Sequence, residues 1–214
     1  APQVRAEALQ SLAGRADASL APLLDDPAAA VRTQAARTLR IIGGDAALRE
    51  KISARLGSTL RADSTEDWQQ LLAAGGDPEA GRRVFFSPGS TCASCHRIES
   101  RGGRIGPDLS IVGRVANRSQ LIRSIVQPSD DIAPQFQGWE VRKTNGEIIT
   151  GLQGHLRSGG AVSIISLDGR ELVIPGKEVA AFGALTASLM PADLQTLLST
   201  EELRDLLAFL ESLR

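Results

Sequence analysis

Both cysteines of the chain lie within one five-residue segment, Cys92-Ala93-Ser94-Cys95-His96, which also holds one of its two histidines. Two thiols separated by two residues, with a histidine directly after the second, form the spacing at which c-type haem is attached. Each thiol can add across one vinyl group of the porphyrin, which brings the adjacent imidazole under the iron. This segment constrains the fold more than any other, because the surrounding chain must then enclose a large planar group.

Three other interpretations of the segment compete with haem attachment. Half of a zinc site has the same spacing, but zinc ligands normally come in paired clusters, and the second histidine, His155, lies far along the chain from His96. A thioredoxin-like dithiol opens a helix after a strand, whereas this segment follows an expected helix and a Pro88-Gly89 turn. The third interpretation is chance. The spacing favours haem.

A haem iron needs a second axial ligand or an open site, and the sequence offers one methionine for this role. Met190 lies between Leu189 and Pro191, in an expected loop ahead of the last helix. His/Met coordination raises the reduction potential of a haem and suits electron transfer. The alternatives are a Met190 that only fills a gap in the core, and coordination by His155, which follows Gly154 near the end of an expected strand.

Other residues are candidates for supporting contacts. An iron-bound histidine needs an acceptor for its second ring nitrogen, and the carbonyl of Pro107 in the Gly-rich loop after the cysteines is predicted to supply it, unless Gly106-Pro107 is an ordinary turn. Trp139 could donate its indole N–H to a haem propionate or belong to the core. Three arginines could pair with the propionates or simply be solvated: Arg101, Arg104 and Arg114.

The start of the chain contains a weak internal repeat. Val4-Arg5-Ala6-Glu7-Ala8-Leu9 is similar to Val31-Arg32-Thr33-Gln34-Ala35-Ala36, and Asp26-Pro27 precedes the second copy as a helix cap and first-turn proline would. Paired helices of this period resemble HEAT repeats, although two copies are too few to be stable alone. We expect residues 1–60 to cap the following domain or to end a truncated array, with a plain helical hairpin as the alternative.

Caps and apolar periodicity predict the later helices. Asp77-Pro78-Glu79 has the cap, first-turn proline and acidic residue of a helix start. Ser199 and Glu202 form a capping box ahead of a leucine stripe. The predicted helices cover 67–74, 77–86, 119–126 and 191–198, with a last helix from 199 onward.

Residues 136–175 have a different pattern. Polar and apolar residues alternate around Trp139 and Val141, and the Asn145-Gly146 and Asp168-Gly169 pairs are typical of hairpin turns. This pattern predicts four strands in two hairpins. We therefore expect a mainly α fold with HEAT-like helices at 1–60, a linker at 61–76, and a helical haem domain at 77–214 that carries a small antiparallel β-sheet inserted at about 136–183.

Composition excludes some function classes. The 24 basic and 25 acidic residues give a net charge of −1, so the sequence has no basic excess that would suggest binding to nucleic acid. No apolar run approaches the roughly 18 residues that a membrane-spanning helix needs. The chain begins with Ala1-Pro2-Gln3 inside a helical pattern, and we expect it to come from a longer protein.

The residues described above resemble a family. Residues 77–126 and 187–214 are similar to a class I cytochrome c, in which the first and last helices cross with a small residue against an aromatic one; Gly81 and Phe209 match these positions. The resemblance assigns the thioether cysteines to Cys92 and Cys95, the proximal histidine to His96, its supporting proline to Pro107 and the distal methionine to Met190. The long segment before Met190 departs from small cytochromes c.

The PVC-type haem-binding domain is a closer match. It resembles this chain in Asp77–Phe85, in Gly146-Glu147 with Thr150-Gly151, and in Ser188-Leu189-Met190-Pro191. The resemblance implies one covalent haem c and a periplasmic or otherwise extracytoplasmic electron-transfer domain that is not itself an enzyme. Its partner would be a redox protein or a fused dehydrogenase. The alternatives are a haem sensor or haem enzyme with an open or labile distal site, and a HEAT-based interaction module in which haem is secondary.

Overall fold

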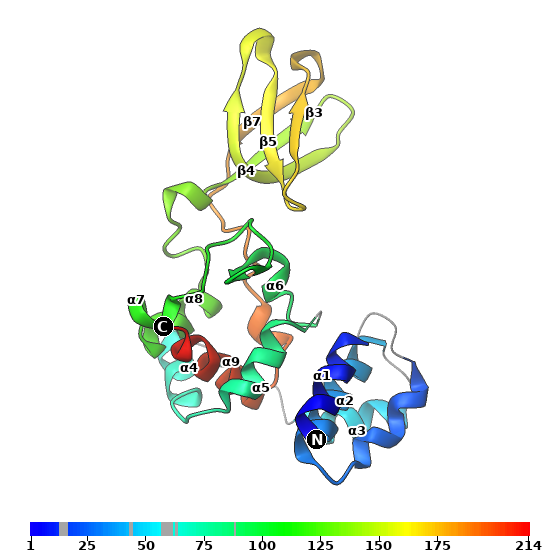
Figure 1. The fold of residues 1–214 in the computed structure, drawn as a ribbon. Coiled ribbons are helices and arrows are strands. Elements are labelled where there is room, and N and C mark those ends of the chain that lie inside the picture. The colour runs from blue at the N-terminus through cyan, green and yellow to red at the C-terminus, as the bar shows by residue number, and fades with distance from the viewer. Residues whose placement is uncertain (13–16, 43–44, 57–61, 63, 88) are drawn as a thin grey trace.

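The computed structural model describes residues 1–12, 17–42, 45–56, 62, 64–87 and 89–214. Its buried apolar side chains form three clusters, one in the N-terminal helices, one in a central group of helices and one in a β-sheet. The sheet projects from one end of the central helices, and the N-terminal helices lie against their other end (Figure 1). Within the described residues, no helix is long and apolar enough to span a membrane.

The N-terminal helices pack around a small aliphatic core. Their elements are α1 (Pro2–Ser11), the 3-10 helix η2 (Ala18–Asp25), α2 (Ala29–Ile42) and α3 (Ala46–Leu56). Asp17 begins η2, because its side chain accepts a hydrogen bond from the Ser19 N–H at 2.8 Å. Leu24, Val31 and Leu39 are fully buried between the helices. The expected repeat segments therefore lie in α1 and α2, while residues 13–16, 43–44 and 57–60 lie outside the described residues.

The central helices include the cysteine segment, which forms α6. They are α4 (Thr65–Leu71), α5 (Pro78–Phe85), α6 (Cys92–Cys95), α7 (Val112–Val115), α8 (Arg118–Val126), the 3-10 helix η6 (Leu194–Thr196) and α9 (Thr200–Ser212). Asp77 caps α5, and the predicted capping box of Ser199 and Glu202 is present at the start of α9. Trp68 and Leu72, which the sequence analysis placed in a linker, are buried in the shared core.

Helices α5 and α9 make the closest contact between two helices. A Cβ atom on Gly81 would lie 1.9 Å from the carbonyl oxygen of Asp205, and 2.8 Å from the Cβ atom of Phe209. The rings of Phe85 and Phe209 lie beside this contact, with centroids 5.9 Å apart. Only glycine permits such an approach, because the obstructing atoms at Asp205 belong to the backbone.

The sheet contains five antiparallel strands in the order β6-β5-β4-β3-β7. The strands are β3 (Gly138–Lys143), β4 (Ile148–Leu156), β5 (Val162–Ser166), β6 (Glu171–Ile174) and β7 (Val179–Ala184), with 3-10 turns η3 (Pro134–Phe136), η4 (Ser158–Gly160) and η5 (Gly176–Glu178) around them. The turns at Gly146 and Gly169 have φ values of 88° and 82°, which glycine adopts without strain. Val141, Val162 and Ile164 are fully buried in a core of the sheet's own.

The expectation of a mainly α fold is wrong, and the fold is mixed. The sheet has one strand more than the two predicted hairpins, because β7 returns to pair with β3 at Val141 and Phe182. β7 consists largely of alanine and glycine, which have no strong preference for strands, so its sequence did not predict pairing. A second, two-stranded sheet of β1 (Arg97–Ile98) and β2 (Arg101–Gly102) lies where a loop was expected.

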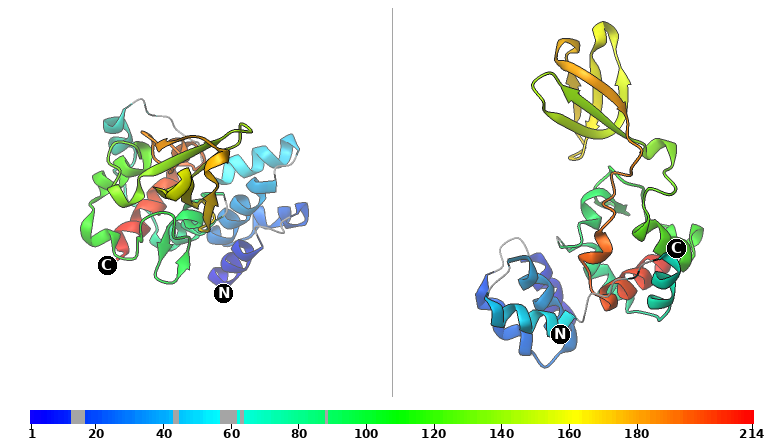
Figure 2. Two further views of the ribbon diagram at one scale, coloured as in Figure 1. Left: turned by 90° about the horizontal axis from the view of Figure 1, so that it is seen from above. Right: turned by 180° about the vertical axis from the view of Figure 1, so that it is seen from behind.

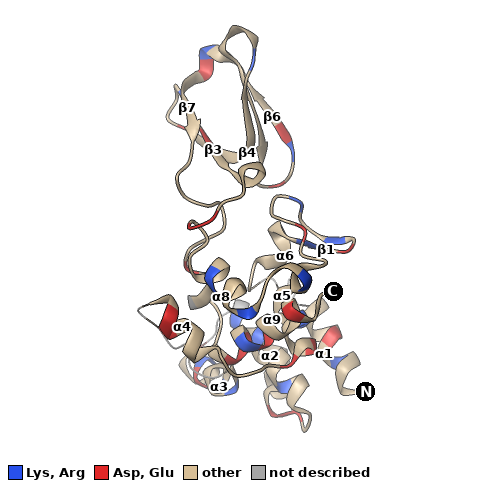
Figure 3. Ribbon diagram, turned by 90° about the vertical axis from the view of Figure 1, so that its left-hand side faces the viewer, with Lys and Arg blue, Asp and Glu red and all other residues tan. Residues whose placement is uncertain are grey.

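The N-terminal helices are joined to the central helices by buried charges. Arg37 of α2 donates from Nε to the Glu202 carboxylate of α9 at 2.9 Å, and both side chains are 2% exposed. Arg40 donates to the other carboxylate oxygen of Glu202 at 2.9 Å. The charged segments of α2 and α9 lie close together in Figure 3. Glu202 therefore caps its own helix and binds a second group of helices.

Candidate functional site around Cys92, Cys95 and His96

The cysteine segment forms a single helical turn. The His96 N–H donates to the carbonyl of Cys92 at 2.9 Å, which closes α6. Thr91 precedes the turn with φ 59°, a conformation that is uncommon for a β-branched residue. The preceding turn is fixed by the buried Ser90, whose hydroxyl donates to the Val84 carbonyl at 2.6 Å. Because residues three apart on a helical turn are neighbours, the two thiols project from the same side of α6.

Both thiols are free and partly buried. The Sγ atom of Cys92 lies 3.5 Å from the Ser90 carbonyl oxygen, and Sγ of Cys95 lies 3.7 Å from the Ser94 hydroxyl. Burial raises the pKa of the Cys92 thiol, and its hydrogen bond to Ser90 only partly opposes this effect. Cys92 is therefore a protonated thiol at neutral pH, which is the opposite of a reactive thiolate or a preformed zinc ligand.

The structure brings His96 and Pro107 together. Nδ1 of His96 lies 3.0 Å from the Pro107 carbonyl oxygen. A carbonyl can only accept, so Nδ1 carries the proton and Nε2 holds the free lone pair. Burial lowers the pKa of the imidazole, while the bond to Pro107 acts in the other direction. His96 is consequently neutral at pH 7, and no described residue makes a hydrogen bond to Nε2.

A Gly-rich loop packs directly on α6 and on the imidazole. A Cβ atom on Gly106 would lie 2.7 Å from Cε1 of His96, and one on Gly103 would lie 2.0 Å from the Ser94 carbonyl oxygen. The N–H of Gly106 also donates to the Cys95 carbonyl at 2.8 Å. Gly106 thus lets the loop lie against the ring, and Gly103 lets it lie against the backbone of α6, a role that was not predicted for Gly103. The signal for it was the clustering of glycines directly after the cysteines.

An ion pair holds the far end of this loop. Arg97, directly after His96, donates from Nε to Asp108 at 3.0 Å. Hydrogen bonds from Ser110, followed by those from Arg97, hold the pKa of the Asp108 carboxyl well below its usual range. The Leu109 N–H donates to the Arg97 carbonyl at 2.8 Å. Pro107 is therefore held between bonded neighbours, which fixes its carbonyl relative to His96.

The remaining residues predicted to contact a haem either make other contacts or are exposed. Arg101 lies over the Phe86 ring, with Cζ 4.0 Å from the centroid. Trp139 stacks on Phe182 within the sheet, with centroids 4.9 Å apart. His155 is exposed on β4. Arg104 is exposed in the Gly-rich loop, and Arg114 lies on α7.

Met190 is partly buried in the segment that connects β7 to η6. This segment runs from the sheet into the central helices, as Figure 1 shows from the front and Figure 2 from behind. The Met190 N–H donates to the Ser188 hydroxyl at 3.1 Å, and the Ser188 N–H donates to the hydroxyl of Ser129 at 3.0 Å. These bonds fix the backbone of the segment. No described residue makes a hydrogen bond to the sulfur of Met190.

The expectation of a metal-binding site is corrected by the side chains themselves. Among the described residues, no group of three or more His, Cys, Asp and Glu could hold a metal ion. An ion bound by the protein alone, such as structural zinc, needs about four such ligands. Cys92, Cys95 and His96 therefore do not belong to a metal centre made only of side chains, and the zinc interpretation of the segment loses its support.

Comparison with known proteins adds no relatives, because no family model and no curated protein matches the chain. The resemblances to cytochrome c and to HEAT repeats therefore depend on the residues quoted in the sequence analysis and on nothing else.

Proposed function

We propose that Cys92, Cys95 and His96 attach one haem c covalently, and that the chain is an electron-transfer domain. The observation that supports this best is the state of His96. Its Nδ1 is engaged by the Pro107 carbonyl at 3.0 Å, so the ring is held in the tautomer that offers Nε2 to an iron. A histidine that only stabilised the fold would have no need for this arrangement directly beside two free thiols.

The residues fit a covalently attached haem. Both thiols are free and lie on one turn, so each could form one thioether bond to a vinyl carbon while its hydrogen passes to the neighbouring carbon. This addition needs no oxidant. Haem also brings four nitrogen ligands for its iron, so the protein needs to supply only one or two more. When bound, the group supplies a one-electron Fe(III)/Fe(II) couple.

The chain's own residues would orient and tune this site. The Pro107 carbonyl makes the imidazole a better donor by accepting its proton-bearing nitrogen. The absence of a side chain at Gly106 lets the ring lie against the loop backbone, where a Cβ atom would be 2.7 Å away. The Arg97–Asp108 pair resists movement of the loop. Together these contacts would limit rotation of the imidazole between the two redox states.

We propose that Met190, together with His96, would hold the haem iron. Met190 is the only methionine in the sequence, its segment leads from the sheet into the central helices, which include α6 (Figure 1), and its backbone is anchored through Ser188 to Ser129. An iron held by both His96 and Met190 would be closed to external ligands, which favours electron transfer. A haem sensor or enzyme is the second candidate, because no described residue holds the Met190 sulfur and the ligand could be labile.

Partners and location follow from the same proposal. The electron donor would be a docked or fused dehydrogenase and the acceptor a respiratory carrier. The location would be periplasmic or otherwise extracytoplasmic, where c-type haem is attached.

The test is expression of the full chain together with the c-type maturation machinery, followed by a pyridine haemochrome assay on acid-acetone-treated protein. We expect one covalent haem in the wild type and none in the double variant Cys92→Ser, Cys95→Ser. Wild-type protein that loses all its haem on extraction would contradict the proposal.

The same preparation tests the second ligand. The haem of the wild type should be low-spin and, once reduced, should bind carbon monoxide slowly. The haem of Met190→Ala should become high-spin and, once reduced, should bind carbon monoxide rapidly. Leu189→Ala is the matched control and should retain the low-spin spectrum. Rapid carbon monoxide binding by the wild type would favour the sensor or enzyme instead.

A further inference from the structure

A hollow of about 430 Å³ lies between the α7–α8 turn and the C-terminal end of α9. Its floor is firm. The Gly113 N–H donates to the Leu213 carbonyl at 2.9 Å, and a Cβ atom on Gly113 would lie 2.3 Å from the Glu211 carbonyl oxygen. The turn therefore packs directly on the backbone at the end of α9.

The charged side chains around the hollow are unevenly paired. Arg118 donates to Glu211 at 2.5 Å and to the carbonyls of Leu72 and Ala74 at 2.8 Å each. Glu211 is the one acidic side chain in the lining, and Arg118 already uses it. The other two basic side chains of the lining, Arg114 and Arg214, have no ion pair or hydrogen bond with any described residue and are exposed.

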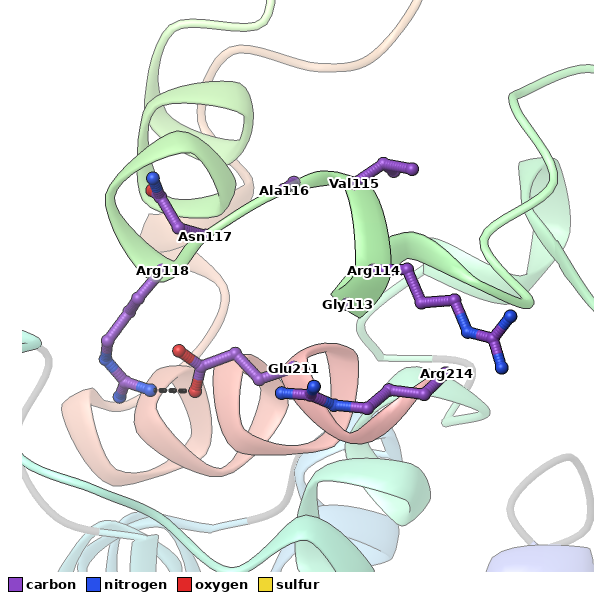
Figure 4. A pocket seen from close by; sticks show the side chains of 8 residues that line it. All are labelled: Gly113, Arg114, Val115, Ala116, Asn117, Arg118, Glu211 and Arg214. Atoms are coloured by element: carbon purple, nitrogen blue, oxygen red, sulfur yellow. Dashed lines mark hydrogen bonds and ion pairs between the residues drawn. The ribbon is translucent and has the colours of Figure 1, made fainter.

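Two exposed aliphatic side chains lie in the same short segment of the chain as Arg114. Val115 lines the hollow and is 72% exposed, and Ile111, one turn earlier, is 52% exposed. Figure 4 shows Val115 pointing away from α9, while the guanidinium groups of Arg114 and Arg214 extend in opposite directions along the hollow. Exposed aliphatic groups next to unpaired charges are typical of surfaces that bind another protein.

We infer that this surface binds an acidic, partly apolar segment of a partner protein. Two separated guanidinium groups match two carboxylates on an extended chain better than they match one small anion. The apolar pair would be covered by aliphatic side chains of the same segment. The isolated positive charges would then be paired and the exposed aliphatic surface removed from water. This inference does not depend on haem attachment.

A labelled synthetic peptide that alternates glutamate with leucine is the probe, and fluorescence anisotropy with the full chain at low ionic strength is the measurement. Two further peptides separate the contributions: one with glutamine in place of glutamate, and one with serine in place of leucine. We expect the first to lose nearly all binding and the second to bind several-fold more weakly. Added salt should weaken binding.

Matched variants locate the site. Arg114→Glu and Arg214→Glu should each lower the affinity about five- to tenfold, whereas Lys177→Glu, which reverses an exposed charge in the turn η5 between β6 and β7, should leave it within about twofold. Val115→Ser should lower the affinity about two- to fivefold. Leu156→Ser is its control, because Leu156 is 71% exposed on β4.

The outcomes decide the inference. Wild-type affinity in Arg114→Glu and Arg214→Glu would overturn it, and so would equal weakening by Lys177→Glu, which indicates diffuse attraction. If the serine-containing peptide bound as tightly as the leucine-containing one, the partner segment would not need apolar side chains, and that part of the inference would be wrong. Tighter binding to anionic lipid vesicles or to duplex DNA than to the peptide would replace the proposed class of partner.

Discussion

Helix α9 contacts two neighbours by opposite means. Toward α5 its contact is apolar and depends on Gly81, which brings the two helices into backbone contact beside Phe209. Toward α2 its contact is ionic, with Glu202 buried against Arg37 at 2.9 Å. Close packing determines how two helices cross. A buried ion pair contributes little net stability but strongly penalises a mismatched partner surface. The first contact therefore builds the helical core, and the second selects which group of helices docks on it.

Removal of the charge on α9 should have the largest effect. Glu202→Ala leaves the buried Arg37 guanidinium with only the Asp205 carboxylate, 3.5 Å away, as a counter-charge, and it removes the N3 side chain of the capping box. We expect the free energy of unfolding in urea to fall by about 3–5 kcal/mol. The adjacent and exposed Glu201 supplies the control, Glu201→Ala, which should cost less than about 0.5 kcal/mol. Similar losses in both variants would show that Glu202 acts only through charge near the helix start.

The glycine contact should come next. Gly81→Ala places a Cβ atom 1.9 Å from the Asp205 carbonyl oxygen, so the helices must separate, at a cost of about 1–3 kcal/mol. Gly75→Ala is the matched control, because a Cβ atom there meets nothing within 4 Å. Thermal unfolding of both variants is the measurement. A stabilised Gly81→Ala would mean that helix propensity outweighs packing at this crossing.

Replacement of the whole ion pair should have a smaller effect than the loss of one partner. The double variant Arg37→Met, Glu202→Leu removes both members of the buried pair, so most of the loss in Glu202→Ala should be recovered. Asp205 is left without its 3.5 Å contact to Arg37, but its side chain is 18% exposed and can be hydrated. We expect a free energy of unfolding within about 1 kcal/mol of the wild type, the remainder reflecting the lost capping interaction. A double variant as unstable as Glu202→Ala would assign the effect to shape and not to charge.

The smallest predicted effect is a pH dependence at the same contact. Burial raises the pKa of Asp205 above its ordinary value of 3.8, although bonds to Asp77 and Arg37 oppose this. The folded protein therefore binds this proton more tightly than the unfolded chain does. The stability from Asp205 is fully present below pH 3.8 and is lost as pH rises through the folded-state pKa. Urea denaturation at a series of pH values gives the free energy of unfolding as a function of pH. We expect it to fall as the pH rises through the Asp205 pKa in the wild type and in the control Asp130→Asn, and to lack this fall in Asp205→Asn.

Local chemistry made part of this structure predictable. The caps at Asp77 and at Ser199 with Glu202 were visible because each involves residues within three positions of one another. Gly106-Pro107 was predicted to support His96 from the chemistry of a coordinated imidazole, and the Pro107 carbonyl lies 3.0 Å from Nδ1. Met190 was also singled out, but its sulfur has no described partner that would decide its role.

Long-range contacts were not predictable in the same way. Arg37 and Glu202 lie far apart in sequence, and neither residue's neighbours distinguish it from an ordinary surface charge. Strand β7 has one β-branched residue, Val179, and four of its six residues are alanine or glycine, so its sequence signals a strand only weakly; it forms because β3 offers a free edge. Trp139 was a candidate for the site, yet Gly154 and Phe182 accommodate its ring within the sheet. In each case, tertiary contacts outweighed local sequence preference.

The connection between the ends of the sheet has a consequence for chain entropy. The Leu185 N–H donates to the Gly138 carbonyl at 2.8 Å, and the side chain of Gln137 donates to the Leu185 carbonyl. Once the sheet folds, its entry and exit are adjacent, so α8 and the Met190 segment are joined by what is effectively a short loop. Loop-closure entropy grows with the logarithm of length, and the folded sheet removes most of that cost. The folded sheet therefore keeps the Met190 segment close to α8 and raises the local concentration of Met190 near the central helices.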